Sequence, residues 1–159
     1  MLKKERKILM TKENLHPSPT RFSKDSFNMN VDTINHAHLA GSYDFNAPYQ
    51  RGLIWTPQQK ERLITSVAEW IPINAVYYNE YSEDRPYEII DGKQRLTTIL
   101  SYLNDEFTWR GHHYSELPPV YRSIIKSFNI SVHMTRYKTE DQCERLFDLI
   151  NFAGTPHQR

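Results

Sequence analysis

Asp91, Lys93 and Arg95 stand together in the polar stretch Asp-Gly-Lys-Gln-Arg at residues 91–95. Strand-forming residues precede this stretch, and apolar residues at helical spacing follow it. A strand that runs directly into a helix presents free backbone N–H groups and the positive end of the helix dipole, which together attract anions. Gly92 allows close approach of a ligand, and Arg95 can hold a phosphate through two donors. The chemistry that this pattern indicates is phosphate binding.

The local pattern also allows a simpler interpretation. Asp91 can cap the helix, with Gln94 three residues later as the second half of a capping box. It can equally hold a Mg²⁺ ion or orient a water molecule. In the simplest case Asp91 is only a cap, and Lys93 and Arg95 are solvated.

Two further polar clusters lie far from this stretch in the sequence. Gln50 and Arg51 follow Pro48-Tyr49, and Asn151 and Gly154 follow the last apolar helical pattern. Each pair suits an ordinary loop or a helix end when taken alone, because Asn and Gly commonly terminate helices.

Helices and short strands alternate around these clusters. Thr56, Pro57 and Gln59 predict a capped helix that ends before Pro72. The other expected elements are strands over 75–81, 87–90 and 129–134, a helix from Asp91 to Leu103, a hairpin over 107–114, a helix after Pro118-Pro119, and a last helix that begins near Thr139 with a capping box to Gln142. This order predicts a mixed α+β domain.

The 159 residues suffice for one domain with a sizeable core, and the formal charge is +1. Aromatic residues make up 13 %, which excludes a disordered tail, and the balanced charge argues against binding nucleic acid by bulk electrostatics alone. The one cysteine, Cys143, excludes a disulfide framework, and we expect a buried, inert thiol. No apolar run reaches the ~20 residues of a membrane span, and no signal peptide is evident, which favours a soluble cytoplasmic protein.

The first 30 residues carry a basic cluster and no periodicity. We expect a flexible basic leader over 1–30, either solvated or touching phosphates, and a single folded domain over 31–159. The histidine pairs 36/38 and 112/113 are only weak candidates for a metal site. Adjacent strand residues point to opposite faces, so His112 and His113 would not bind one ion together without a bulge.

Three segments together resemble a known family: PYQRGLIWTPQQ (48–59), IIDGKQRLTTI (89–99) and LFDLINFAGTP (146–156). Their order and spacing resemble the DGQQR-type ParB-like domain of the ParB/sulfiredoxin superfamily. That domain also forms the N-terminal part of GmrSD-type restriction proteins, and it occurs in phage-defence and phage-encoded proteins. The resemblance covers about residues 40–156 and implies a short mixed sheet surrounded by helices.

The resemblance implies a site for a nucleoside triphosphate, with the base (ATP, GTP, CTP or a deoxynucleotide) left open. The implied catalytic residues are Asp91, Gln94 and Arg95, with Asp91 also the candidate ligand for Mg²⁺. The implied phosphate-binding residues are Gln50, Arg51, Gly92, Lys93, Thr97, Asn151 and Gly154. Lys93 departs from the usual Gln of the motif, which leaves phosphate binding intact and puts the nucleotide preference in doubt.

The family further implies a setting of DNA modification, restriction or phage–host conflict. No HNH-like pattern is evident, so we do not expect this chain to cut DNA by itself. We expect it to hydrolyse or transfer phosphate, with a protein partner that supplies an effector domain, and DNA and a homodimer as further candidate partners. The alternative is a nucleotide- or DNA-binding module without turnover, acting as a sensor or as an inhibitor of a host system.

Overall fold

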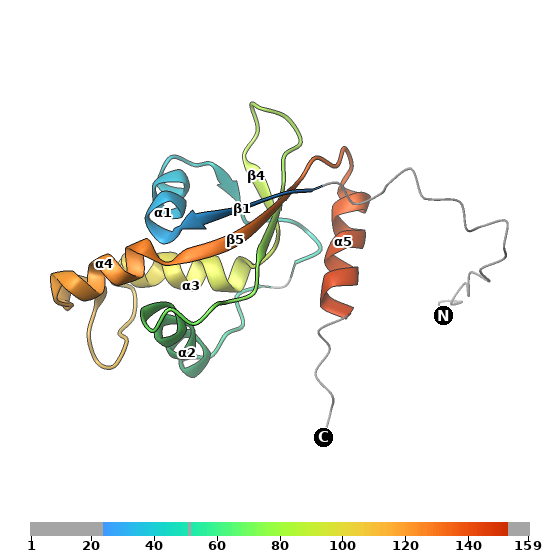
Figure 1. Ribbon diagram of the computed structural model, residues 1–159. Coiled ribbons are helices and arrows are strands. Elements are labelled where there is room, and N and C mark those ends of the chain that lie inside the picture. Colours follow the sequence, from blue (N-terminus) through green and yellow to red (C-terminus); the bar gives the residue numbers. More distant parts are fainter. Residues whose placement is uncertain (1–23, 51, 153–159) are drawn as a thin grey trace, which may run out of the picture.

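A computed structural model describes residues 24–50 and 52–152 (Figure 1). The strands are β1 (Lys24–Asn30), β2 (Tyr43–Asp44), β3 (Val76–Asn79), β4 (Tyr87–Asp91) and β5 (Asn129–Thr135). The helices are α1 (Val31–Leu39), α2 (Pro57–Ala68), α3 (Lys93–Leu103), α4 (Pro119–Ser127) and α5 (Glu140–Phe152), with a short 3-10 helix over Tyr114–Glu116. Within the described residues, no helix has the length and apolar character to cross a membrane.

The five strands form one sheet in the order β1-β5-β3-β4-β2. The pairs β1–β5 and β3–β4 are antiparallel, whereas β5–β3 and β4–β2 are parallel. The predicted α+β class with a short mixed sheet is therefore confirmed.

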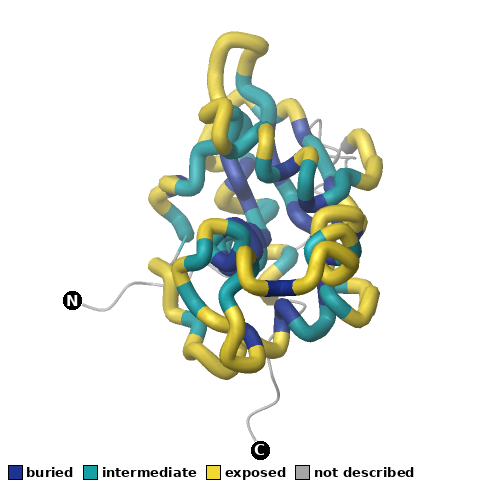
Figure 2. The backbone as a smooth tube through the Cα atoms, turned by 90° about the vertical axis from the view of Figure 1, so that its left-hand side faces the viewer, coloured by how far each residue is buried: buried dark blue, intermediate teal, exposed yellow. Residues whose placement is uncertain are grey.

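One face of the sheet supplies the main core. Val76 and Tyr78 of β3, and Ile130 and Val132 of β5, alternate along their strands and are almost fully buried. Buried residues of α1, α2, α3 and α4 join the same apolar cluster, so these four helices pack against that face. Figure 2 shows buried segments in the interior and exposed loops around them, with the β3–β4 loop projecting at the top.

The opposite face is covered only in part. Ile89 of β4 belongs to the main core, so alternation directs Glu88 and Ile90 to the other side. Both are nevertheless buried, at 6 % and 0 % exposed, because α5 packs against β4 there. α5 therefore forms a second, smaller layer on the sheet, next to the strand that leads into the Asp91–Arg95 stretch (Figure 1).

Helix α2 begins as the sequence predicts. The Thr56 side chain accepts a hydrogen bond from the Gln59 N–H, and the Gln59 side chain accepts from the Thr56 N–H, with Pro57 at the first helical position. Leu63, Ile64 and Val67 form its buried side. The capping box is local, so its residues suffice to specify it.

Three expectations need correction. Residues 24–30, assigned to the leader, form β1 and pair with β5 along their whole length, while residues 1–23 lie outside the described residues. Helix α1 was not predicted, because Val31 and Ile34 are its only buried residues and give too sparse a pattern. The expected hairpin over 107–114 is one isolated bridge between Trp109 and His112, followed by the 3-10 helix.

Candidate functional site

The predicted phosphate-binding stretch forms the junction between β4 and α3. Strand β4 continues through Asp91, which pairs with Tyr77 of β3, and α3 begins after Gly92. Asp91 therefore does not cap α3, contrary to one of the interpretations above. Gly92 at the N-cap offers no side-chain hydrogen bond, so no described side chain caps the first N–H groups of the helix.

Gly92 has a conformation that other residues rarely adopt. Its φ is +102°, and a Cβ atom at this position would lie 2.8 Å from Cγ2 of Val76. Strand β3 thus crosses the junction at a distance that only glycine permits.

Arg95 and Asp91 form an ion pair within the junction. Arg95 Nη2 lies 2.9 Å from Asp91 Oδ2 and also donates to the Ala75 carbonyl over 3.0 Å. The two side chains are only 16 % and 20 % exposed. The guanidinium therefore connects α3 to β4 and to the residue before β3. Its positive charge faces the Asp91 carboxylate and not the solvent.

Two glutamines fasten the preceding loop to the junction. Gln50 Nε2 donates to the carbonyl oxygens of Ile89 and Ile90 at the end of β4. Gln94 Nε2 donates to the Gly52 carbonyl over 2.7 Å, and its oxygen faces the Trp55 N–H at 3.4 Å. The expected capping role of Gln94 is therefore wrong, because its side chain binds the loop instead.

Two polar atoms at the junction are buried and have no hydrogen-bond partner among the residues that the structure describes: Gln50 Oε1 and Arg95 Nε. Buried polar groups of native proteins are paired in the great majority of cases, so such atoms mark places where water or a ligand completes the site. Both belong to residues that the sequence assigned to nucleotide binding.

Only some of the remaining candidate residues lie in the part of the chain that the structure describes. Lys93 and Thr97 are half-buried in the first turns of α3. Asn151 lies exposed on α5, where its side chain donates to the Phe147 carbonyl one turn earlier. Arg51 and Gly154 lie outside the described residues. The structure thus brings Gln50, Gly92, Gln94 and Arg95 together around Asp91.

A buried carboxylate beside the junction was missed by the sequence analysis. Glu88 Oε1 accepts hydrogen bonds from the hydroxyls of Tyr49, at 2.5 Å, and Tyr81, at 3.2 Å. Tyr81 Oη also lies 3.3 Å from Cys143 Sγ, and the ring of Tyr49 packs on Phe147 at 5.4 Å. No local signal identifies it, because a Glu next to a buried Ile in a strand is expected to face solvent.

This buried cluster of Tyr49, Tyr81, Glu88 and Cys143 is held in its protonated hydroxyl and thiol forms. Burial raises the pKa of Tyr49 and of Tyr81, and hydrogen bonding to Glu88 and to Cys143, respectively, adds to the rise. Burial raises the pKa of the Cys143 thiol to about 11, with the charge of Glu88 as a further cause. Cys143 is 0 % exposed, so it is the buried thiol that the sequence predicts and does not supply a thiolate.

The donor set fits Mg²⁺ only as part of a nucleotide complex. The described residues contain no group of three His, Cys, Asp or Glu side chains able to hold a metal ion. Mg²⁺ in phosphate sites usually keeps several waters and takes one or two carboxylates together with phosphate oxygens. Asp91 is the carboxylate at the junction that suits this role.

The comparison with protein families identifies the class of protein. The family model described as GmrSD restriction endonuclease, N-terminal domain, matches residues 31–151. This match covers most of the chain, and the chain therefore belongs to that family. The family predicted from the three sequence segments is thereby confirmed.

The comparison with solved structures gives a more distant similarity. The C-terminally truncated chromosome-partitioning protein ParB from Caulobacter crescentus, complexed with CTP-gamma-S, is 12 % identical with a TM-score of 0.48. The similarity covers 83 % of this chain and 55 % of that one, so the chain spans about half the length of that ParB structure. No curated protein matches the chain.

Proposed function

We propose that the β4–α3 junction binds the phosphates of a nucleoside triphosphate, and that the protein hydrolyses it or transfers its phosphate. One observation carries the proposal: α3 begins at a glycine with no side-chain cap, directly beside Asp91, Gln94 and Arg95. Membership of the GmrSD restriction family supports a restriction setting for this activity. Phage–host conflict as the wider setting, and an effector step supplied by another domain or a partner, are parts of the proposal.

The chain's own residues have distinct roles in this proposal. The first N–H groups of α3 bind phosphate oxygens, and Lys93 adds a positive charge in the first turn. Arg95 Nη2 now donates to the Asp91 carboxylate. When the nucleotide binds, this donor releases Asp91 and binds a phosphate oxygen instead. Asp91 is then free to orient the attacking water or to bind Mg²⁺, which supplies neutralisation of phosphate charge. Gln50 and Gln94 fix the loop that borders the site.

The alternative is a module that binds a nucleotide or DNA without turnover. The observation that favours it is the ion pair itself, since Asp91 is held at 2.9 Å by Arg95 and is not available as a base. In that case the junction only senses the ligand, and the Asp91–Arg95 pair persists in the complex. The two functions differ in whether phosphate is released.

Phosphate release from a panel of ribo- and deoxynucleoside triphosphates, with and without Mg²⁺ and DNA, tests the proposal. Binding is measured by calorimetry in parallel. The variants are Asp91→Asn, Lys93→Glu and Arg95→Gln. The matched control is Lys138→Gln, at an exposed lysine outside the junction. Thermal unfolding of each variant separates loss of function from loss of fold.

We expect Asp91→Asn to abolish turnover while binding persists, and Lys93→Glu and Arg95→Gln to weaken binding at least tenfold. Lys138→Gln should behave as the wild type. Binding without release under every condition supports the module without turnover. Binding or turnover that survives all three junction variants contradicts the assignment of the site.

A further inference from the structure

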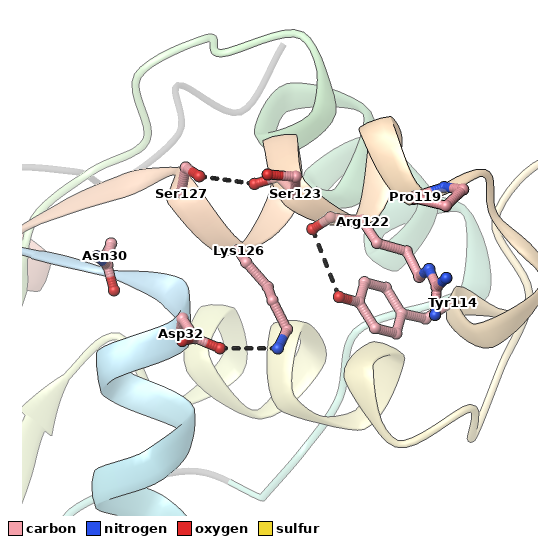
Figure 3. Close-up of a pocket in the computed structure, with 8 residues that line it drawn as sticks. All are labelled: Asn30, Asp32, Tyr114, Pro119, Arg122, Ser123, Lys126 and Ser127. Carbon is pink, nitrogen blue, oxygen red and sulfur yellow. Dashed lines mark hydrogen bonds and ion pairs between the residues drawn. The ribbon is translucent and has the colours of Figure 1, made fainter.

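A polar cavity lies between α1, α4 and the 3-10 helix (Figure 3), and no residue of the β4–α3 junction lines it. Its volume is about 520 Å³. The lining residues are Asn30, Asp32, Tyr114, Pro119, Arg122, Ser123, Lys126 and Ser127. This volume falls within the range of about 300–1,000 Å³ that small-molecule sites occupy. None of these residues belongs to the three sequence clusters assigned to the nucleotide.

Helix α4 supplies the charge of the cavity. Arg122 and Lys126 are four residues apart, as are Ser123 and Ser127, so two rows of polar side chains follow the same side of the helix. The hydroxyl of Ser127 donates to the Ser123 carbonyl, and both lie along the cavity wall in Figure 3. The row of cations therefore faces solvent through the cavity, while Ile125 of the same helix is in the core.

The two cations of this row differ in their pairing. Lys126 Nζ lies 2.9 Å from Asp32 Oδ1, and this hydrogen bond raises the pKa of the lysine. Among residues 24–50 and 52–152, no carboxylate pairs with the Arg122 guanidinium, which lies beside Tyr114 in Figure 3. Arg122 is thus a charged, planar donor at the cavity that no carboxylate in the described part of the chain neutralises.

Helix α1 also directs its N-terminal end at the cavity. Asn30 is its N-cap, accepting from the Thr33 N–H at 2.7 Å, and Asp32 occupies its first turn. An anion near this end gains from the helix dipole, which now stabilises the Asp32 carboxylate. The carboxylate of Asp32 occupies the position that a bound anion would take.

We propose that this cavity is a phosphate-binding site in which Arg122 is the permanent ligand and Lys126 the exchangeable one. Arg122 holds two phosphate oxygens through its fork of donors. Lys126 turns from Asp32 to the phosphate, so Asp32 competes with the ligand for one cation. The phosphate is either a phosphodiester of a nucleic acid or a free phosphoryl anion. This site is separate from the proposed nucleotide site and does not depend on it.

The proposal predicts that removing a positive charge from the cavity weakens phosphate binding and that removing the negative charge of Asp32 strengthens it. The probes are inorganic phosphate, followed by ¹H–¹⁵N NMR, and a labelled single-stranded oligonucleotide, followed by fluorescence anisotropy at several salt concentrations. We expect Arg122→Gln to weaken binding about tenfold and Lys126→Gln about threefold, whereas Asp32→Asn tightens it about threefold. The matched control is Arg136→Gln, whose guanidinium already pairs with Asp25 and Glu80.

The two ligand sources give different results. If inorganic phosphate shifts the amide signals of Arg122 and Lys126, the cavity takes a free phosphoryl anion. If only the oligonucleotide binds, and Arg122→Gln lowers its salt slope by about one, the ligand is a nucleic-acid phosphodiester. The proposal is overturned if neither probe binds, if Arg122→Gln has no effect, or if Asp32→Asn weakens binding while the variant remains folded.

Discussion

The hydroxyl of Tyr49 donates a 2.5 Å hydrogen bond to Glu88, which lies 39 residues later in the middle of β4. This bond fixes the residue before Gln50 at the strand that ends in Asp91. Through Tyr81 and Cys143 the same carboxylate connects β4 to α5. The junction, the loop before it and α5 therefore share one buried polar contact.

Glu88→Ala should destabilise the fold strongly. The substitution leaves the Tyr49 hydroxyl without its acceptor and the Tyr81 hydroxyl with Cys143 Sγ alone. A buried hydroxyl left unpaired costs about 1–3 kcal/mol. We expect the free energy of unfolding, measured in urea, to fall by about 3 kcal/mol. Tyr49→Phe removes one bond and should cost about 1.5 kcal/mol.

The control for the Glu88→Ala and Tyr49→Phe variants is Glu83→Ala in the exposed β3–β4 loop, which should change the free energy of unfolding by less than about 0.5 kcal/mol. Equal effects at positions 83 and 88 would show that the buried cluster contributes no stability.

Gly92→Ala should cost more than Gly41→Ala, although both glycines have positive φ. The backbone strain is similar, but a Cβ at Gly41 meets nothing within 4 Å, whereas one at Gly92 meets Val76 at 2.8 Å. Overpacking of this kind adds about 1–3 kcal/mol to the strain. Urea unfolding measures both variants.

The clash with Val76 can be separated from the strain. If the clash contributes, Val76→Ala and Gly92→Ala together should cost less than the sum of the single changes, by about 1 kcal/mol. Strict additivity would assign the whole effect to the backbone conformation.

How much of this site the sequence could predict depends on the range of each interaction. The strand, the glycine and the helix at 87–103 follow from local pattern, and so does the capping box of α2. The roles of Gln50 and Gln94 do not, because their partners lie about 40 residues away in sequence. A local pattern cannot distinguish a glutamine that caps its own helix from one that binds a distant loop.

The same reason explains the strands and helices that were missed. β1 is held by β5, which lies about one hundred residues later, and the only apolar residues of its sequence are Phe27 and Met29. Asp91 looked like a cap because Asp is common before helices, but its pairing with Tyr77 extends the strand through it. Glu88 was overlooked because its burial depends on α5, and α5 covers the sheet only in the folded chain.

Stability should fall as pH rises above about 9. Cys143 has a pKa of about 11 in the folded protein against an ordinary value of 9.0. Between these values the unfolded chain has lost the thiol proton and the folded chain keeps it, so rising pH favours unfolding. The contribution lost is about 2 kcal/mol by a pH of about 10.5, and it is retained in full below pH 8.

Urea unfolding of the wild type and of Cys143→Ala from pH 7 to 10.5 isolates this effect. The difference in stability between the two proteins should shrink as the pH rises, because the variant lacks the titrating thiol. A difference that is constant over this range would mean that Cys143 does not titrate differently in the two states.

The Asp91–Arg95 pair should contribute modestly to stability. Its two side chains are mostly enclosed, and Arg95 also binds the Ala75 carbonyl. Removing one partner leaves the other charge partly buried, so Asp91→Asn and Arg95→Gln should each cost about 1–3 kcal/mol. A double-mutant cycle should give a coupling energy of about 1 kcal/mol between the two residues. A coupling energy near zero would mean that the ion pair contributes nothing to stability.

The loop before α2 should become mobile when Gln94 loses its amide donor. Gln94→Glu replaces the N–H that binds the Gly52 carbonyl with an oxygen, so two acceptors face each other at the position of a 2.7 Å bond. We expect the amides of residues 52–56 to exchange with deuterium at least tenfold faster, while those of β3 and β5 are unchanged. Gln58→Glu, on the exposed first turn of α2, makes the same chemical change where a negative charge is favourable at the helix start, and should leave exchange unaltered. Since the loop borders the junction, equal exchange in both variants would mean that Gln94 does not hold it there.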